Sequence, residues 1–163
     1  MPLRTAVRDT RLVAALLTIA EHEARALGDP SPSAEHLLLS AMLVDDPSAR
    51  DAIGSISSTV DTAAVRAAIG AVHSASLSAI GIAPPTIDAA MPSARGAYHS
   101  EVSAQEVFQR ARLLSRHSRT GISSAHVLLA AAEREYGTVA RVFQHLGLDR
   151  NAVLTAATTA ALT

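Results

Sequence analysis

The chain has 163 residues and a formal net charge of −1, a size that allows one compact domain with a real hydrophobic core. It contains no cysteine, and all 14 basic residues are arginine, which excludes disulfides, thiolate metal sites, lysine nucleophiles and phosphate-binding loops that need a lysine. Apolar residues make up 48% of the chain and aromatic residues only 2%, so the core must consist of alanine and aliphatic side chains, and the many alanines favour helix.

The first half of the chain predicts four helices, because its apolar residues recur at spacings of three and four. The first helix begins near Thr10 and stops at Gly28, and the fourth ends at Gly70. The expected N-caps of the four helices are, in order, Thr10, Ser33, Asp46 and Asp61.

Residues 72–102 interrupt this pattern, since they contain several prolines and glycines and little periodicity. We expect a linker or a crossover loop there. Helical signals resume where Ser103 and Glu106 have the spacing of a capping box. The starts of the next three helices are marked by Ser123, Gly137 and Asp149.

The second half repeats the order of the first. Residues 33–39 align with residues 123–129 at an offset of ninety positions, and the apolar pattern continues in register beyond this motif. The sequence therefore predicts an all-α fold of about eight helices in two pseudo-symmetric four-helix repeats. We expect a single domain over 1–163, with the first repeat over 8–71 and the second over 103–161.

Four stretches carry a resemblance to a known family. Residues 23–27 and 35–39 are similar to a first-repeat signature, whereas 104–108 and 137–147 are similar to a second repeat. Over residues 8–160 the chain resembles the amino-terminal domain of Clp-type AAA+ unfoldases, the double Clp repeat. The resemblance implies a non-catalytic docking domain that sits on an unfoldase ring and recruits adaptors or substrates.

The same resemblance implies two ligand sites, because in some relatives each repeat binds phosphorylated arginine through a Thr-Glu-His motif. The glutamate of the first motif corresponds to Glu35, but Ala34 replaces the threonine before it. In the second motif Ala125 replaces the glutamate, and Ser124 keeps the hydroxyl. We therefore take Glu35 and Ser124 as candidate binding residues and expect weakened phosphoarginine recognition, more so in the second repeat.

A local basic cluster offers another candidate binding surface. Arg112, Arg116 and Arg119 have the spacing of one helical face, on which an acidic protein surface could dock. Nucleic acid is a poorer fit because stacking aromatic residues are missing. A solvated helix face without a partner is the plainer interpretation of these arginines.

Histidines and serines in the chain do not form a catalytic pattern. His36 and His126 each follow a capping serine by three positions, where we expect a packed ring bonded to backbone rather than a metal ligand. There is no Gly-x-Ser-x-Gly motif for an exposed nucleophile. We therefore expect no enzyme activity, no metal and no cofactor.

These observations lead to one function and one alternative. We expect a protein-interaction module that docks substrates or adaptors for a Clp protease, or modulates that protease. The alternative is a helical module that binds a peptide or a small hydrophobic ligand, as a sequestering or resistance protein. We further expect a cytoplasmic monomer or weak dimer that binds neither membrane nor nucleic acid, since no apolar stretch is long enough to span a bilayer and the net charge is near zero.

Overall fold

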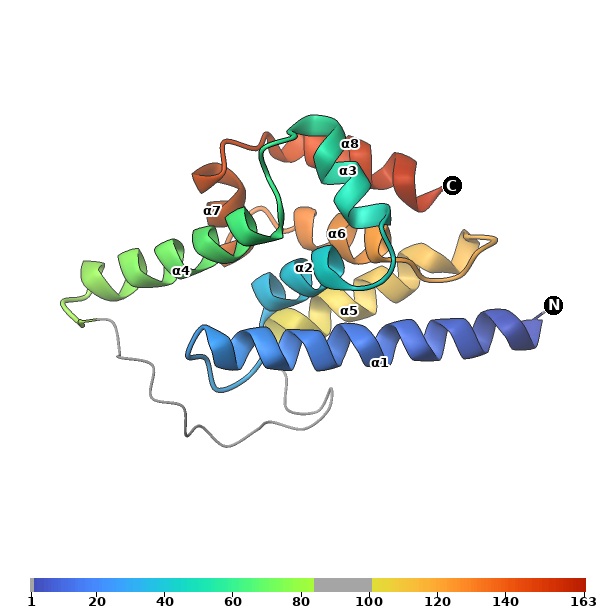
Figure 1. The fold of residues 1–163 in the computed structure, drawn as a ribbon, viewed down its shortest axis with the longest axis horizontal. Helices are drawn as coiled ribbons and strands as arrows, with labels where there is room; N and C mark the ends of the chain where they lie inside the picture. The colour runs from blue at the N-terminus through green and yellow to red at the C-terminus, as the bar shows by residue number, and fades with distance from the viewer. Residues whose placement is uncertain (1, 84–100) are drawn as a thin grey trace.

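The computed structural model describes residues 2–83 and 101–163, and within these ranges the chain forms eight α-helices and one short 3-10 turn (Figure 1). The elements are α1 (Pro2–Ala26), α2 (Ala34–Leu43), α3 (Ser48–Ile56), α4 (Thr62–Ala79), α5 (Val102–Leu114), the 3-10 turn η2 (Ser115–His117), α6 (Ser124–Ala132), α7 (Thr138–His145) and α8 (Arg150–Ala161). The predicted all-α class is confirmed. Residues 84–100 of the expected linker lie outside the described residues.

Most of the predicted N-caps start helices as expected. The side chains of Asp61 and Asp149 accept hydrogen bonds from amides in the first turns of α4 and α8, at 2.8 and 3.2 Å. Ser33 and Ser123 precede α2 and α6 with extended backbone. These side chains satisfy amides that a helix start leaves without an intrahelical partner.

Four predicted helix boundaries are wrong. Helix α3 has Pro47 rather than Asp46 as its N-cap. Helix α5 begins at Val102 with Glu101 as its N-cap, so Ser103 does not cap it.

The first helix begins at Pro2, and Thr10 lies inside it, where its hydroxyl donates a hydrogen bond to the Ala6 carbonyl. The fourth helix does not end at Gly70 but continues to Ala79, so part of the expected linker is helical. A glycine inside a helix costs only about 1 kcal/mol, and burial of Val72 on the following turn offsets that cost.

The two repeats are interleaved rather than side by side. Helix α3 of the first repeat packs most extensively on α8 of the second, and α4 packs on α7. The short helices α2 and α6 pack against each other at the centre, and nearly all of their residues are buried. One continuous hydrophobic core therefore runs through both repeats.

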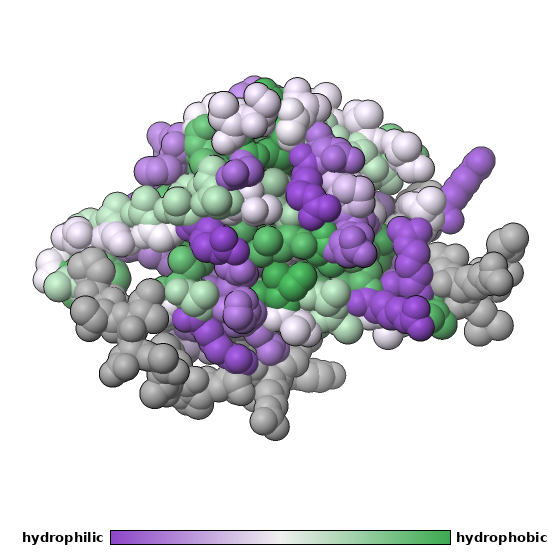
Figure 2. Space-filling view, in the orientation of Figure 1, coloured by the Kyte–Doolittle hydropathy of each residue, from purple (hydrophilic) through white to green (hydrophobic). Residues whose placement is uncertain are grey.

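The surface carries both polar and apolar patches, as the face in Figure 2 shows. No helix in the described ranges is long and apolar enough to cross a membrane.

Candidate functional site

A histidine fixes the start of α2. The backbone amide of Ser33 donates to Nδ1 of His36 at 3.1 Å, which places the ring proton on Nε2, and that atom lies 3.2 Å from Oδ2 of Asp29. His36 is fully buried, and His126 has the same bond with the Ser123 amide at the start of α6. The prediction of packed histidines bonded to backbone is confirmed for both repeats.

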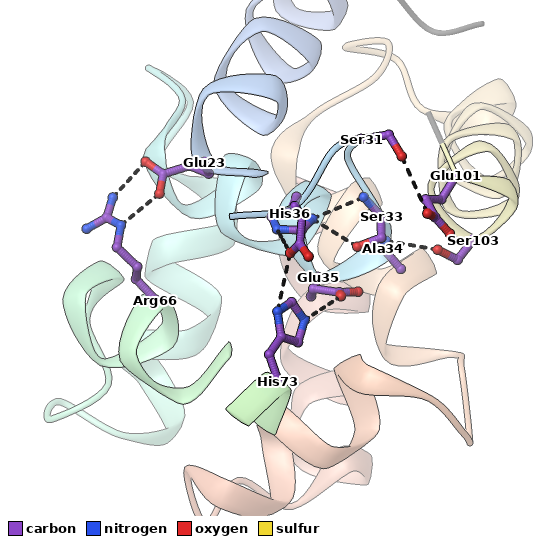
Figure 3. A network of polar contacts seen from close by, with 11 residues as sticks. Glu23, Ser31, Ser33, Ala34, Glu35, His36, Arg66, His73, Glu101 and Ser103 are labelled. Carbon is purple, nitrogen blue, oxygen red and sulfur yellow. Dashed lines mark hydrogen bonds and ion pairs between the residues drawn. The ribbon is translucent and has the colours of Figure 1, made fainter. Parts of the chain in front are cut away.

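Glu35 lies next to this ring and is bound by a second histidine (Figure 3). Nε2 of His73 on α4 lies 2.9 Å from Oε1 of Glu35, and Nδ1 of the same ring lies 3.2 Å from Oδ2 of Asp29. His73 therefore stands between two carboxylates that come from different segments, the turn after α1 and the first turn of α2. This arrangement joins three parts of the first repeat.

His73, Asp29 and Glu35 shift one another's pKa values so that all three side chains are charged. Contacts with Asp29 and Glu35 raise the pKa of His73 to about 9, against the opposing effect of burial. Burial would raise the pKa of Asp29, but its contacts with His36 and His73 outweigh this effect and hold it well below the usual range. Burial would also raise the pKa of Glu35, but its hydrogen bonds, above all the one with His73, together outweigh burial and lower this pKa. His73 is thus an imidazolium between two carboxylates at neutral pH.

A cavity of about 610 Å³ opens beside Glu35. It is lined by residues from the turn after α1, the first turn of α2, the second half of α4 and the starts of α5 and α7. The start of α5 forms one wall, because the Ser103 hydroxyl accepts a hydrogen bond from the Ala34 amide at 3.2 Å (Figure 3). Gly137 and Thr138 also line the cavity, where α7 begins without a side-chain cap.

The corresponding place in the second repeat is filled. There the start of α6 meets the start of α3, and the Ser124 hydroxyl accepts from the Ala49 amide at 3.0 Å and lies 3.0 Å from the Ser48 hydroxyl. Asp46 accepts hydrogen bonds from the amides of Ser48 and Ser124. At an offset of ninety residues, the equivalents of Ser124, Asp46, Ser48 and Ala49 are Ala34, Tyr136, Thr138 and Val139, in that order. These residues lie where the start of α2 meets the start of α7. Ala34 offers no hydroxyl and Tyr136 no carboxylate there, whereas Thr138 keeps its hydroxyl.

The two predicted binding residues therefore have different surroundings. Glu35 lines the open cavity, although only 7% of its surface is exposed and His73 holds its carboxylate. Ser124 is fully buried, and its hydroxyl is used in bonds between α6 and α3. A ligand cannot reach Ser124 in this conformation, so its hydroxyl serves the packing of the two repeats.

The basic cluster does not form one helical face. Helix α5 ends at Leu114, so only Arg112 is on it, whereas Arg116 lies in η2 and Arg119 in the following turn. The prediction of a shared helical face is wrong because the chain changes direction after Leu114. Arg112 and Arg116 nevertheless line one cavity of about 760 Å³ together with Gly121.

Sequence reasoning missed His73, the partner of Glu35, and Asp29, the second carboxylate on the His73 ring. His73 falls in the stretch that the Gly70 signal assigned to a linker, and Asp29 reads as part of a helix stop. The sequence does not place His73 near either carboxylate, because the tertiary packing of α4 on α2 brings its ring to Asp29 and Glu35. Among the described residues, no group of three or more histidine and acidic side chains has an arrangement that could hold a metal ion.

These helices and their order define a fold of the Clp N-terminal domain type. The crystal structure of the N-terminal domain of the caseinolytic protease-associated chaperone ClpD from Arabidopsis thaliana matches with a TM-score of 0.62, covering 91% of this chain and 90% of that chain. The two sequences are 22% identical, so the likeness establishes the fold. No family model and no curated protein sequence matches the chain.

Proposed function

We propose that the chain is a non-catalytic protein-interaction module, which docks a segment of an adaptor, a substrate or a Clp unfoldase in the cavity beside Glu35. The observation that carries this proposal is the difference between the two pseudo-equivalent helix contacts. In the second repeat, Ser124 and Asp46 close the contact with hydrogen bonds. In the first repeat, the same place is a concave opening of about 610 Å³, a size typical of ligand sites.

The lining of the cavity suits a stretch of polypeptide. Leu27, Leu77 and Val139 supply apolar surface, whereas Arg134 and Thr138 supply hydrogen-bond donors. The first amides of α7 have no side-chain cap and can donate to carbonyl or carboxylate groups of a docked segment. A cationic group of the partner would have to take the place of His73 on Glu35. The chaperone whose N-terminal domain has this fold is associated with a protease, which supports a partner from such a machine.

Filling the cavity tests this proposal. Ala34→Leu should place extra volume in the cavity that Ala34 lines, and Ala67→Leu makes the same change on an exposed part of α4. Each protein is immobilised, exposed to native cytosol, and its bound proteins are quantified by mass spectrometry. We expect a Clp unfoldase, protease or adaptor to be retained by the parent chain and by Ala67→Leu, and to fall about tenfold with Ala34→Leu.

Thermal melts of all three proteins check that the fold is intact. Recovery of no Clp component by the parent chain, or equal recovery by a folded Ala34→Leu protein, contradicts the proposal.

A further inference from the structure

The arginines whose side chains the structure describes divide into two groups by their partners. Most have an acceptor within the protein: a carboxylate, a serine hydroxyl or a backbone carbonyl. This paired group comprises Arg25, Arg50, Arg66, Arg110, Arg134, Arg141 and Arg150. A second group makes no hydrogen bond or ion pair with any residue in the described ranges. We call it the arginine face; it comprises Arg8, Arg11, Arg112, Arg116 and Arg119, all exposed.

The arginine face surrounds two open cavities on either side of α1. Arg8 and Arg11 line a cavity of about 880 Å³ between α1 and residues 44–47. Arg112 and Arg116 line the cavity of about 760 Å³ on the other side, between α1 and the end of α5. In Figure 2 hydrophilic and hydrophobic residues lie next to each other along α1. Four of the five arginines, Arg8, Arg11, Arg112 and Arg116, are therefore gathered around one helix.

Both cavities also have apolar walls. Val7 and Leu12 line the larger one, and Val13 and Leu113 line the smaller one. Val7 is 51% exposed and Leu113 is 45% exposed, so both side chains can contact a partner that enters these cavities. The surface thus offers apolar depressions with guanidinium groups at their edges.

We infer that the arginine face docks an acidic, amphipathic segment of a partner protein. Each guanidinium can bind a carboxylate through two parallel hydrogen bonds, and none has to give up an existing partner to do so. Aliphatic side chains of the same segment would fill the depressions beside α1. This surface is separate from the cavity beside Glu35, since the two share no lining residue, so it can serve a second partner.

Acidic groups in the same depressions favour a protein over a nucleic acid. Asp45 and Asp46 line the larger cavity, and Asp9 lines the smaller one, where its Oδ1 is buried without a hydrogen-bond partner. A continuous phosphate backbone would be repelled by these carboxylates, whereas a folded segment can place its own carboxylates opposite the arginines alone. Phe108 is the aromatic residue of the smaller cavity and packs against the core, so it is not a free platform for stacked bases.

Fluorescence anisotropy with a labelled helical peptide, glutamates on one face and leucines on the other, tests this inference. The variants are the pairs Arg8→Gln with Arg11→Gln and Arg112→Gln with Arg116→Gln. A matched control is Arg25→Gln with Arg141→Gln, which removes the same charge from exposed positions elsewhere. We expect each arginine-face pair to weaken peptide binding about tenfold, the control to bind as the parent does, and added salt to weaken binding.

Three further measurements test whether something other than an acidic peptide binds the arginine face. A peptide with glutamine in place of glutamate should not bind, and duplex DNA should bind more weakly than the acidic peptide. Tighter binding of DNA, equal losses in the control pair, or no binding of the acidic peptide each overturns the inference. So does a dimer in sedimentation that the arginine-face variants dissociate, because the occupant would then be a second copy of the chain. None of these outcomes depends on the cavity beside Glu35.

Discussion

His73 shows how one residue can hold three segments together. Its ring bonds Glu35 on α2 and contacts Asp29 after α1, while its own backbone belongs to α4. Two carboxylates this close to each other and to the core would be costly without a cation between them. Because the imidazolium offsets that cost only while protonated, the first repeat should carry a stability that depends on pH.

Replacing His73 with glutamine should remove that dependence. The folded-state pKa of about 9 lies above the ordinary value of 6.5, so the stabilisation is complete below pH 6.5 and is lost as the pH rises towards 9. After allowance for solvent screening of a half-buried group, we expect about 2 kcal/mol of unfolding free energy to be lost over this window. Urea unfolding at pH 6 and pH 9.5, on the parent chain and on His73→Gln, measures this loss.

His145→Gln is the control for this experiment, because His145 lies exposed on α7. It should keep the pH dependence of the parent chain. A His73→Gln protein that loses stability over the same window as the parent would contradict the assignment.

At the scale of elements, two equivalent helix starts have diverged. The start of α6 is tied to the start of α3 through Ser124, whereas Ala34 leaves the start of α2 open towards α7. Both repeats keep the capping serine, the histidine three residues after it and the bond between the two. One hydroxyl and one carboxylate, those of Ser124 and Asp46, mark the difference between a packed contact and a cavity.

Ser124→Ala should therefore destabilise the protein. The substitution removes the acceptor of the buried Ala49 amide, and an unsatisfied buried donor costs about 1–3 kcal/mol. Denaturant unfolding of this variant measures the loss, with Ser78→Ala on the exposed side of α4 as the matched control. The control should change stability by less than about 0.5 kcal/mol. Equal effects of the two substitutions would show that the Ser124 bonds contribute nothing to stability.

At the scale of the whole molecule, each repeat completes the other. Helix α3 packs on α8 and α4 on α7, so each of these pairs combines helices from the two halves. The central helices α2 and α6 have almost no exposed residue, and a single half would leave one of them uncovered. The repeats should consequently fold as one cooperative unit rather than as two.

The fragments 1–83 and 101–163 test this cooperativity. Each alone should show weak helicity and no cooperative melt, because short helices without tertiary packing are marginal in water. Mixing the two fragments should restore the far-UV circular dichroism of the intact chain. A cooperative melt of either fragment by itself would contradict the interleaved arrangement as the source of stability.

Much of the fold follows from local sequence signals. Capping residues such as Ser33, Asp61, Ser123 and Asp149 mark helix starts because they must satisfy amides within their own turn. The repeat can be recognised at an offset of ninety residues because equivalent helices need equivalent caps and apolar positions. Boundaries set by distant packing were predicted poorly, as the extension of α4 beyond Gly70 shows.

The sequence by itself determined the helical class, the repeat and the position of Glu35 at a helix start. Only the tertiary structure decided that His73 stands between Asp29 and Glu35, that Ser124 is buried, and that Arg8 and Arg11 extend the basic surface. The physical reason is the range of the interactions. Caps and periodicity act within one or two turns of a helix, whereas cavities, ion pairs and unpaired charges depend on which helices pack together.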